Sequence, residues 1–319
     1  MTLSRRQFLG AGMALGAAWL ARPLSAVAAA AKATTLAPGV TRITLGKATI
    51  TTIHDGFFVR PLDDKFVRNV AFAEVQKALA DAGLPTDKLE VPFTPVVADI
   101  GNERVLFDCG NGEFGAATAG KLLENMAKAG IAPDSITAVV FSHFHGDHIN
   151  GLRNKAGALA FPKAKIFVPA PEWGFWMDDA KMAAAPEAMK GNFNAVRRVF
   201  GPIVDTLKRF EPGTELLPGL RSIAAFGHTP GHTVFTVDGG AQKLLYWADT
   251  TNVASLFVRN PDWAVMFDMD AEAARVTRRK LADMVIAEKM LVAGYHLPGS
   301  AIGTLAARGT GYEFTPLAG

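Results

Sequence analysis

The chain has 319 residues, of which 49% are hydrophobic and 20% are charged. This composition is ordinary for a globular protein with a sizeable core. The formal net charge is only +3, and the basic residues form no stripe, so we expect no nucleic-acid partner. No segment beyond the first thirty residues is long and apolar enough to be read as a membrane span.

The N-terminal segment has the pattern of an export signal. Arg5 and Arg6 precede an apolar run rich in alanine and glycine, and small residues follow at Ala26 and Ala28. A positive start, an apolar run and a small-residue cleavage site are the parts of a secretory signal, and the paired arginines resemble a twin-arginine signal. We therefore expect residues 1–30 to engage the twin-arginine export machinery, and the mature protein to be periplasmic or secreted. An uncleaved N-terminal anchor is the alternative.

Residues 31–319 alternate predicted strands and helices. In chain order we expect strands over 40–45 and 48–53, a helix over 71–82, strands over 95–100 and 104–107, a helix over 115–129 and a strand over 136–141. There follow a strand over 165–169, helices over 171–178 and 192–209, strands over 220–226, 233–237 and 243–247, a helix over 270–288 and a strand over 290–294. Strand groups followed by helices, twice over, predict one domain of two packed sheets with helices outside.

Ligand-type side chains gather directly after the predicted strand 136–141. His143 and His145 share one face of an extended segment, and Gly146 allows a bend that returns Asp147 and His148 towards the same point. Converging imidazole and carboxylate groups suit a borderline divalent metal such as zinc. A histidine-rich surface loop is the alternative.

Three further ligand-type residues each follow a predicted strand, namely His228, Asp249 and His296. Loops at the ends of strands are where sites are commonly built, because the sheet holds them rigidly. These residues can therefore complete the metal site that the six-residue motif begins.

This order of motifs resembles the metallo-β-lactamase superfamily: His-x-His-x-Asp-His, then Gly-His, then Asp, then His. The resemblance covers the chain from about residue 40 to its end. It implies an αββα sandwich, an α/β arrangement of two mixed β-sheets flanked by helices. It also implies a site for two metal ions, the first held by His143, His145 and His228, the second by Asp147, His148 and His296, with Asp249 as the bridge.

Within the superfamily, the chain looks most like the methyl parathion hydrolase and lactonase branch. The stretches that carry this resemblance are 52–56, 172–176, 227–232, 297–300 and 309–314. That branch lines its substrate pocket with aromatic side chains, so the pocket candidates are Phe57, Phe58, Phe66, Trp173, Phe175, Trp176 and Phe193. Asn252 joins them, at a position where acyl-homoserine lactonases often carry tyrosine. Packing in the core is the alternative for each aromatic residue.

Two further polar residues are candidates for a supporting role. Asp108 follows an early predicted strand and can orient a metal-binding histidine, or it can cap the loop that follows. His232 lies close to His228 in the sequence, but the implied ligand set is complete without it.

The resemblance implies a metal-dependent hydrolase. Two divalent ions would acidify a bridging water and polarise the bond attacked in a lactone, aryl ester or phosphotriester, and Asp147 would carry the proton. Zn²⁺ suits the ligands best, while Mn²⁺, Co²⁺ and Fe²⁺ also accept them. We expect a small uncharged ester-like substrate and, by analogy with relatives, a homodimer. The alternatives are a thioester, β-lactam or acyl-homoserine lactone hydrolase on the same fold, and a metal-binding protein without turnover.

Overall fold

The structure is a computed structural model that describes residues 31–318. The expected signal peptide, residues 1–30, lies outside the described residues. Among the helices that the structure describes, none has the length and apolar character needed to cross a membrane.

The first sheet has eight strands in the order β1-β2-β3-β6-β7-β8-β9-β10. Neighbours are antiparallel from β1 to β7 and parallel from β7 to β10. The bounds are β1 Thr34–Ala37, β2 Val40–Leu45, β3 Ala48–Ile53, β6 Val96–Ile100, β7 Glu103–Phe107, β8 Ala138–Val140, β9 Lys165–Pro169 and β10 Lys208–Phe210. The short interior strand β8 is buried at all three positions, as expected for a parallel strand covered on both faces.

The second sheet has seven strands in sequence order, from β11 to β17. Only the β14–β15 pair is parallel. The bounds are β11 Glu215–Leu217, β12 Leu220–Ala224, β13 Thr233–Asp238, β14 Lys243–Tyr246, β15 Leu291–Ala293, β16 Ile302–Arg308 and β17 Gly311–Pro316. The parallel pair is decisive for the site, because it brings the carboxyl ends of β14 and β15 to the same edge.

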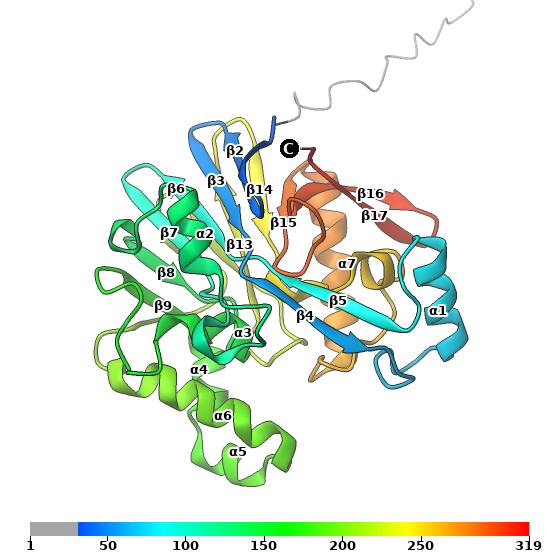
Figure 1. Cartoon of the computed structure of the whole chain (residues 1–319), viewed down its shortest axis with the longest axis horizontal. Coiled ribbons are helices and arrows are strands. Elements are labelled where there is room, and N and C mark those ends of the chain that lie inside the picture. The colour runs from blue at the N-terminus through cyan, green and yellow to red at the C-terminus, as the bar shows by residue number, and fades with distance from the viewer. Residues whose placement is uncertain (1–30, 319) are drawn as a thin grey trace, which may run out of the picture. The chain divides into compact units, whose positions relative to one another are not determined.

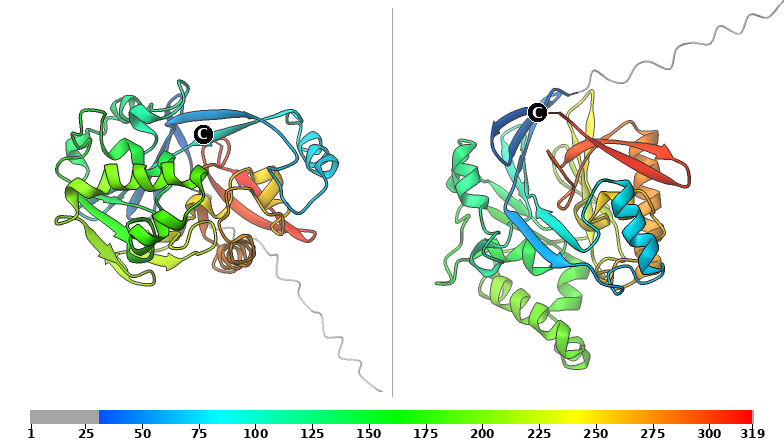
Figure 2. Two further views of the ribbon diagram at one scale, coloured as in Figure 1. Left: turned by 90° about the horizontal axis from the view of Figure 1, so that it is seen from below. Right: turned by 45° about the vertical axis from the view of Figure 1, so that its right-hand side comes forward.

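Helices cover the outer faces of both sheets (Figure 1, Figure 2). Helices α2, α4 and α6 pack on the first sheet, and α7 packs on the second. The remaining helices are α1, α3 and α5; the bounds are α1 Phe72–Asp81, α2 Leu122–Lys128, α3 Gly146–Ile149, α4 Ala170–Trp176, α5 Asp179–Ala184, α6 Glu187–Phe200 and α7 Ala271–Ala287. The order helix, sheet, sheet, helix is the αββα sandwich that the resemblance implies, and the predicted fold class is confirmed.

A hydrophobic layer between the sheets holds the sandwich together. Phe107 of the first sheet stacks on Tyr246 of the second with ring centroids 5.0 Å apart, and Phe235 lies 5.5 Å from Phe107. Burying an aromatic side chain of this kind contributes roughly 1.5–3 kcal/mol. This layer therefore fixes how the strand ends of one sheet meet those of the other.

A two-stranded ribbon stands apart from both sheets. Strands β4 (Gly56–Pro61) and β5 (Lys88–Phe93) pair with each other, and the ribbon extends towards α1 (Figure 1). Its apolar face joins a separate cluster with α1 and the segment Ala254–Val258. The sequence pattern predicts neither this ribbon nor the hairpin β16–β17.

Two predicted helices differ from those observed. The helix expected over 115–129 forms only over Leu122–Lys128, because Gly120 has a φ of +79° and a Cβ there would meet the Gly112 carbonyl oxygen at 2.2 Å. The helix expected over 192–209 runs instead from Glu187 to Phe200. It ends beside Pro202, because proline has no backbone N–H to donate and its ring clashes with the carbonyl of the preceding helical turn.

Candidate metal centre

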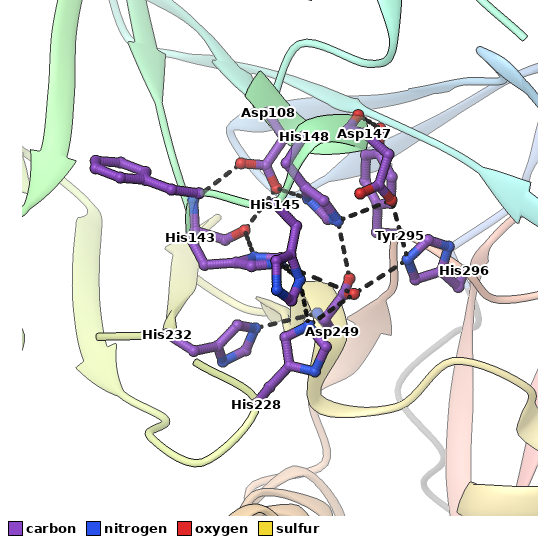
Figure 3. A network of polar contacts seen from close by, with 12 residues as sticks. Asp108, His143, His145, Asp147, His148, His228, His232, Asp249, Tyr295 and His296 are labelled. Atoms are coloured by element: carbon purple, nitrogen blue, oxygen red, sulfur yellow. Dashed lines mark hydrogen bonds and ion pairs between the residues drawn. The ribbon is translucent and has the colours of Figure 1, made fainter. Parts of the chain in front are cut away.

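Four strand ends deliver the ligand-type side chains. The loop after β8 and the start of α3 carry His143, His145, Asp147 and His148, and the segments after β12, β14 and β15 carry His228, Asp249 and His296. Figure 3 shows these side chains pointing towards one another. The structure thus brings together all seven residues that the sequence analysis assigned to metal binding.

The first group consists of His143, His145, His228 and Asp249, whose ligand atoms all lie within 4.8 Å of one another. Nδ1 of His145 lies 3.1 Å from Nε2 of His143 and 3.0 Å from Nε2 of His228. Oδ2 of Asp249 lies 3.3 Å from Nε2 of His228 and 4.0 Å from Nε2 of His143.

The second group consists of Asp147, His148 and His296. Oδ2 of Asp147 lies 3.4 Å from Nε2 of His148 and 3.6 Å from Nε2 of His296. Asp249 also reaches this group, because its Oδ1 lies 3.1 Å from His148 Nε2 and its Oδ2 lies 3.1 Å from His296 Nε2. The Asp249 carboxylate therefore lies between the two groups and faces both.

Both groups fit a divalent metal ion. Donors held about 2.1 Å from a tetrahedral centre lie roughly 3.4 Å apart, and the neighbouring donor atoms here are 3.0 to 4.0 Å apart. His148 Nε2 and Asp249 Oδ1 are buried and lie 3.1 Å apart, but neither makes a hydrogen bond among the described residues. A metal ion satisfies such atoms, and imidazole with carboxylate is a donor set typical of zinc.

Without metal, the pKa values of the packed histidines differ widely. Burial lowers the pKa of His145 to about 3, and the charge of His228 adds to the effect. Burial also acts on His228, but hydrogen bonds with Asp249 and Asp268 outweigh it and raise the pKa of His228 to about 9. Metal binding requires neutral imidazole and therefore displaces the proton from His228.

Asp108 holds His148 in place. Its Oδ2 accepts a hydrogen bond from Nδ1 of His148 at 2.9 Å, which leaves Nε2 facing the other ligands. The same carboxylate accepts from the Ser142 amide, the Ser142 hydroxyl and the Tyr246 hydroxyl. Such carboxylate–histidine pairs fix the tautomer and the ring orientation of a ligand. Of the two roles considered for Asp108, its position fits the orienting one.

His232 lies beneath Asp249 and belongs to neither group. Its Nδ1 lies 2.9 Å from the Ala225 carbonyl oxygen, so Nδ1–H donates there. Nε2 then accepts the backbone N–H of Asp249 at 3.1 Å. Burial, reinforced by the charge of His228, lowers the pKa of His232 to about 3, so the ring stays neutral and supports the backbone of Asp249.

Asp268 and Arg278 are supporting residues that the sequence analysis missed. Asp268 Oδ1 accepts from His228 Nδ1 at 3.0 Å. Arg278, on α7 and only 1% exposed, donates to Asp268 and to the carbonyls of Thr250 and Pro261. No local motif marks either residue, although a charged residue among the apolar positions of a predicted helix was a usable signal.

A cavity of about 350 Å³ opens onto the ligands, lined among others by His145, Asp147, His228, Asp249 and His296. Its apolar walls come from the β4–β5 ribbon and from Phe267, and its polar walls include amide side chains; these lining residues are Phe58, Val91, Phe93, Phe267, Asn111, Asn192 and Asn252. An apolar cavity with a few placed polar groups suits a small, largely uncharged ligand. Asn252 lies where the sequence analysis expected it.

Of the seven aromatic residues proposed for the pocket, Phe58 lines the cavity. The other six lie elsewhere, and the prediction is corrected for them. Phe175 packs on Trp176 and Phe193. Trp176 and Phe193 are fully buried and pack against each other, with ring centroids 4.8 Å apart. Phe66 is also fully buried and supports the cavity residue Phe267 from behind. Trp173 packs under the guanidinium of Arg209.

Phe57 is the last of these six residues, and its position follows from strand geometry. Successive side chains on a strand point to opposite faces. Phe58 lines the cavity, so its neighbour Phe57 on β4 faces away from it.

The sandwich and its His/Asp cluster define a metal-dependent hydrolase. Residues 94–292 match the family model described as the metallo-beta-lactamase superfamily, and the chain belongs to this superfamily.

The chain is similar to two solved structures and, over a short stretch, to one curated protein. AidC, described as a dizinc quorum-quenching lactonase in complex with a product, is 28% identical with a TM-score of 0.82, and the match covers 87% of this chain and 97% of AidC. The hydrolase AbOPH is 22% identical with a TM-score of 0.81 over 88% of this chain and 98% of its own, which supports the fold alone. Ribonuclease Z of Methanothermobacter thermautotrophicus is 35% identical over 68 residues, 21% of this chain, and the match spans only 19% of that protein's length.

Proposed function

We propose that this protein hydrolyses lactones or other small uncharged esters, including aryl esters and phosphotriesters, with two divalent ions, most naturally Zn²⁺. The observation that carries the proposal is the apolar cavity that ends on Asp147, Asp249 and His296. Such a cavity would accommodate an uncharged acyl or aryl group and place the ester bond next to these metal-binding residues. The similarity to AidC over nearly its whole length supports a lactone among the substrates.

The ligand groups would hold the ions, with Asp249 facing both. Bound divalent ions supply an acidified water and polarise the oxygen of the bond that is attacked. Asp147 is the carboxylate at the cavity floor whose side chain is 24% exposed, and it can take a proton from the attacking water and return it to the leaving group. Burial opposes ionisation of Asp147, but the charge of His148 outweighs it and lowers the pKa of Asp147. Asp147 is therefore a base at neutral pH.

The choice among esters rests on the cavity walls. Phe58, Phe93 and Phe267 form an apolar side that suits an acyl chain or an aromatic ring. Asn252 places a side-chain amide in the same cavity, and its Oδ1 is buried without a hydrogen-bond partner among the described residues. This amide is available to orient a polar group of the substrate, including the amide of an acyl-homoserine lactone.

The test combines metal content per chain with hydrolysis of four substrates: an aryl ester, an aromatic lactone, an acyl-homoserine lactone and methyl paraoxon. We expect two metal ions and chelator-sensitive turnover of at least one substrate. Asp147→Asn, measured at a metal concentration that fills both groups, is expected to lose about 10²–10⁴-fold in kcat. Asp134→Asn, which changes an exposed carboxylate paired with Lys163, is the control. Full activity in Asp147→Asn would refute the proton-carrying role, and two metals without any turnover would favour a metal-binding protein.

We also propose export through the twin-arginine route and assembly as a homodimer. The paired Arg5 and Arg6 support the first, and the second rests on analogy with relatives. Replacing both arginines by lysine should leave the protein in the cytoplasm, as cell fractionation would measure. Light scattering of the purified protein would establish its oligomeric state.

A further inference from the structure

Glu172, at the start of α4, is a fully buried carboxylate that belongs to neither ligand group. Its Oε2 accepts the backbone N–H of Phe144 at 3.1 Å and the indole N–H of Trp176 at 2.6 Å. Its Oε1 accepts the backbone N–H of Gly231 at 2.7 Å. Burial raises the pKa of Glu172, and the Thr229 hydroxyl together with these N–H donors counters the rise. The side chain thus has two acceptor oxygens that three N–H donors use.

The two backbone donors lie in different ligand loops. Phe144 stands between His143 and His145, and Gly231 lies three residues after His228. These loops follow strands of different sheets, β8 and β12. One carboxylate therefore ties together the two segments that supply all three imidazoles of the first group.

The packing around Gly231 shows how closely the second loop approaches α4. A Cβ at Gly231 would meet the backbone nitrogen of Glu172 at 2.3 Å and the Pro171 carbonyl carbon at 2.8 Å. Only glycine lets the loop come near enough for its N–H to reach the carboxylate. This close approach is an observation independent of the hydrogen bonds.

We propose that Glu172 is a positioning residue that sets the affinity of the first metal group by fixing the His143–His145 loop against the His228 loop. The inference rests on the proposed metal occupancy. Glu172 does not line the cavity. It acts through the backbone of Phe144 and Gly231 and through Trp176, whose ring lies 6.3 Å from that of His145. The second group draws His148 and His296 from α3 and from the segment after β15, which Glu172 does not contact, so the effect is confined to the first group.

The main variant is Glu172→Gln. Glutamine keeps one acceptor oxygen, but its NH₂ group faces an N–H donor, so one of the two loops loses its hydrogen bond. Loss of a supporting group of this kind lowers metal affinity by about 10–100-fold. The control is Asp134→Asn, which changes an exposed carboxylate paired with Lys163 and should leave zinc affinity unchanged.

Two backgrounds separate the groups. In His296→Ala only the first group is complete, and in His228→Ala only the second. Zinc affinity is measured in each background by competition with a chromophoric chelator. We expect Glu172→Gln to weaken zinc binding in the His296→Ala background and to leave it unchanged in the His228→Ala background. Equal weakening in both, in parallel with a loss of metal-free stability in urea, would mean that Glu172 serves only the fold and would overturn the proposal.

A second variant covers the case in which Glu172→Gln does not fold. Gly231→Ala pushes the second loop away from α4 and keeps the carboxylate, and it should show the same selective loss from the first group. Unchanged affinity in Gly231→Ala, with near-ultraviolet dichroism showing native packing, would also overturn the proposal. If the unchanged protein binds no zinc in this assay, the proposed function fails instead, whatever the variants do.

Discussion

The two halves of the sandwich contribute to the metal centre in different ways. The first half delivers four ligand-type side chains from six consecutive residues, His143 to His148, beside a short buried strand. The second half delivers three from separate segments, with Asp249 and His296 aligned only because β14 and β15 are parallel. In the first half the local backbone gathers the ligands, and Asp108 and Glu172 then hold them in place. In the second half only long-range contacts gather them, with Arg278 and Asp268 as supports.

Each metal group nevertheless takes ligands from both halves. Metal removal should therefore have the largest effect of all the proposed changes, because it removes the link between the two halves. We expect a chelator to abolish hydrolysis completely. A ligand that binds only the folded state adds about 4 kcal/mol at a concentration 1,000-fold above its Kd, and the free energy of unfolding should fall by this order when metal is removed. Urea unfolding with and without zinc would measure it. Equal stability in both conditions would mean that the ions do not link the two halves.

Arg278→Met tests the long-range support of the second half. Arg278 and Asp268 are each 1% exposed, and removing one member of a buried ion pair costs about 3–5 kcal/mol, because the other charge is left unpaired. We expect a loss of this size in urea unfolding. Lys280→Met changes an exposed residue of the same helix and should stay within about 0.5 kcal/mol. A loss below about 1 kcal/mol in Arg278→Met would show that the second half does not depend on this network.

Asp108→Asn and Asp268→Asn form a matched pair, because one orients His148 from the first half and the other orients His228 from the second. Each change keeps the shape of the side chain and removes its charge. We expect a loss of about 10–100-fold in zinc affinity for each, in the second group for Asp108→Asn and in the first for Asp268→Asn. Chelator competition would measure both losses. Losses in the opposite groups would contradict the assigned orientations.

The smallest expected effect concerns the cavity wall, which belongs to neither sheet. Phe58 is 40% exposed, and Phe58→Ala removes part of the apolar wall, which is worth about 1 kcal/mol. KM for an aryl or acyl substrate should rise about fivefold with kcat unchanged. Phe57→Ala, the neighbour on the other face of β4, is the control and should leave KM unchanged. A larger effect from Phe57 would reverse the strand-face assignment.

What the sequence predicted depends on how local each signal is. The strands of the first sheet from β2 to β9, strands β12 to β15 of the second sheet, the motif from His143 to His148 and the order of the later ligands were predicted because each signal is local. Asp268, Arg278 and Glu172 were not, because their partners lie elsewhere in the chain or in another loop, as with Asp268 and His228. Six of the seven predicted pocket aromatics were wrong for a related reason, and only Phe58 lines the cavity. The ribbon β4–β5 was not predicted, so the face of Phe57 could not be assigned.

The ribbon has a further consequence for how this protein can change. It supplies Phe58, Val91 and Phe93 to the cavity but none of the ligand-type residues of the two groups. Its one hydrogen bond to those residues is the Pro92 carbonyl, which accepts from His296 Nδ1 at 2.7 Å, and a backbone carbonyl survives side-chain substitution. Random variation at Phe58 and Val91 can therefore shift substrate preference while the reactive chemistry is inherited intact, which makes the ribbon the natural segment to diversify in a laboratory evolution experiment.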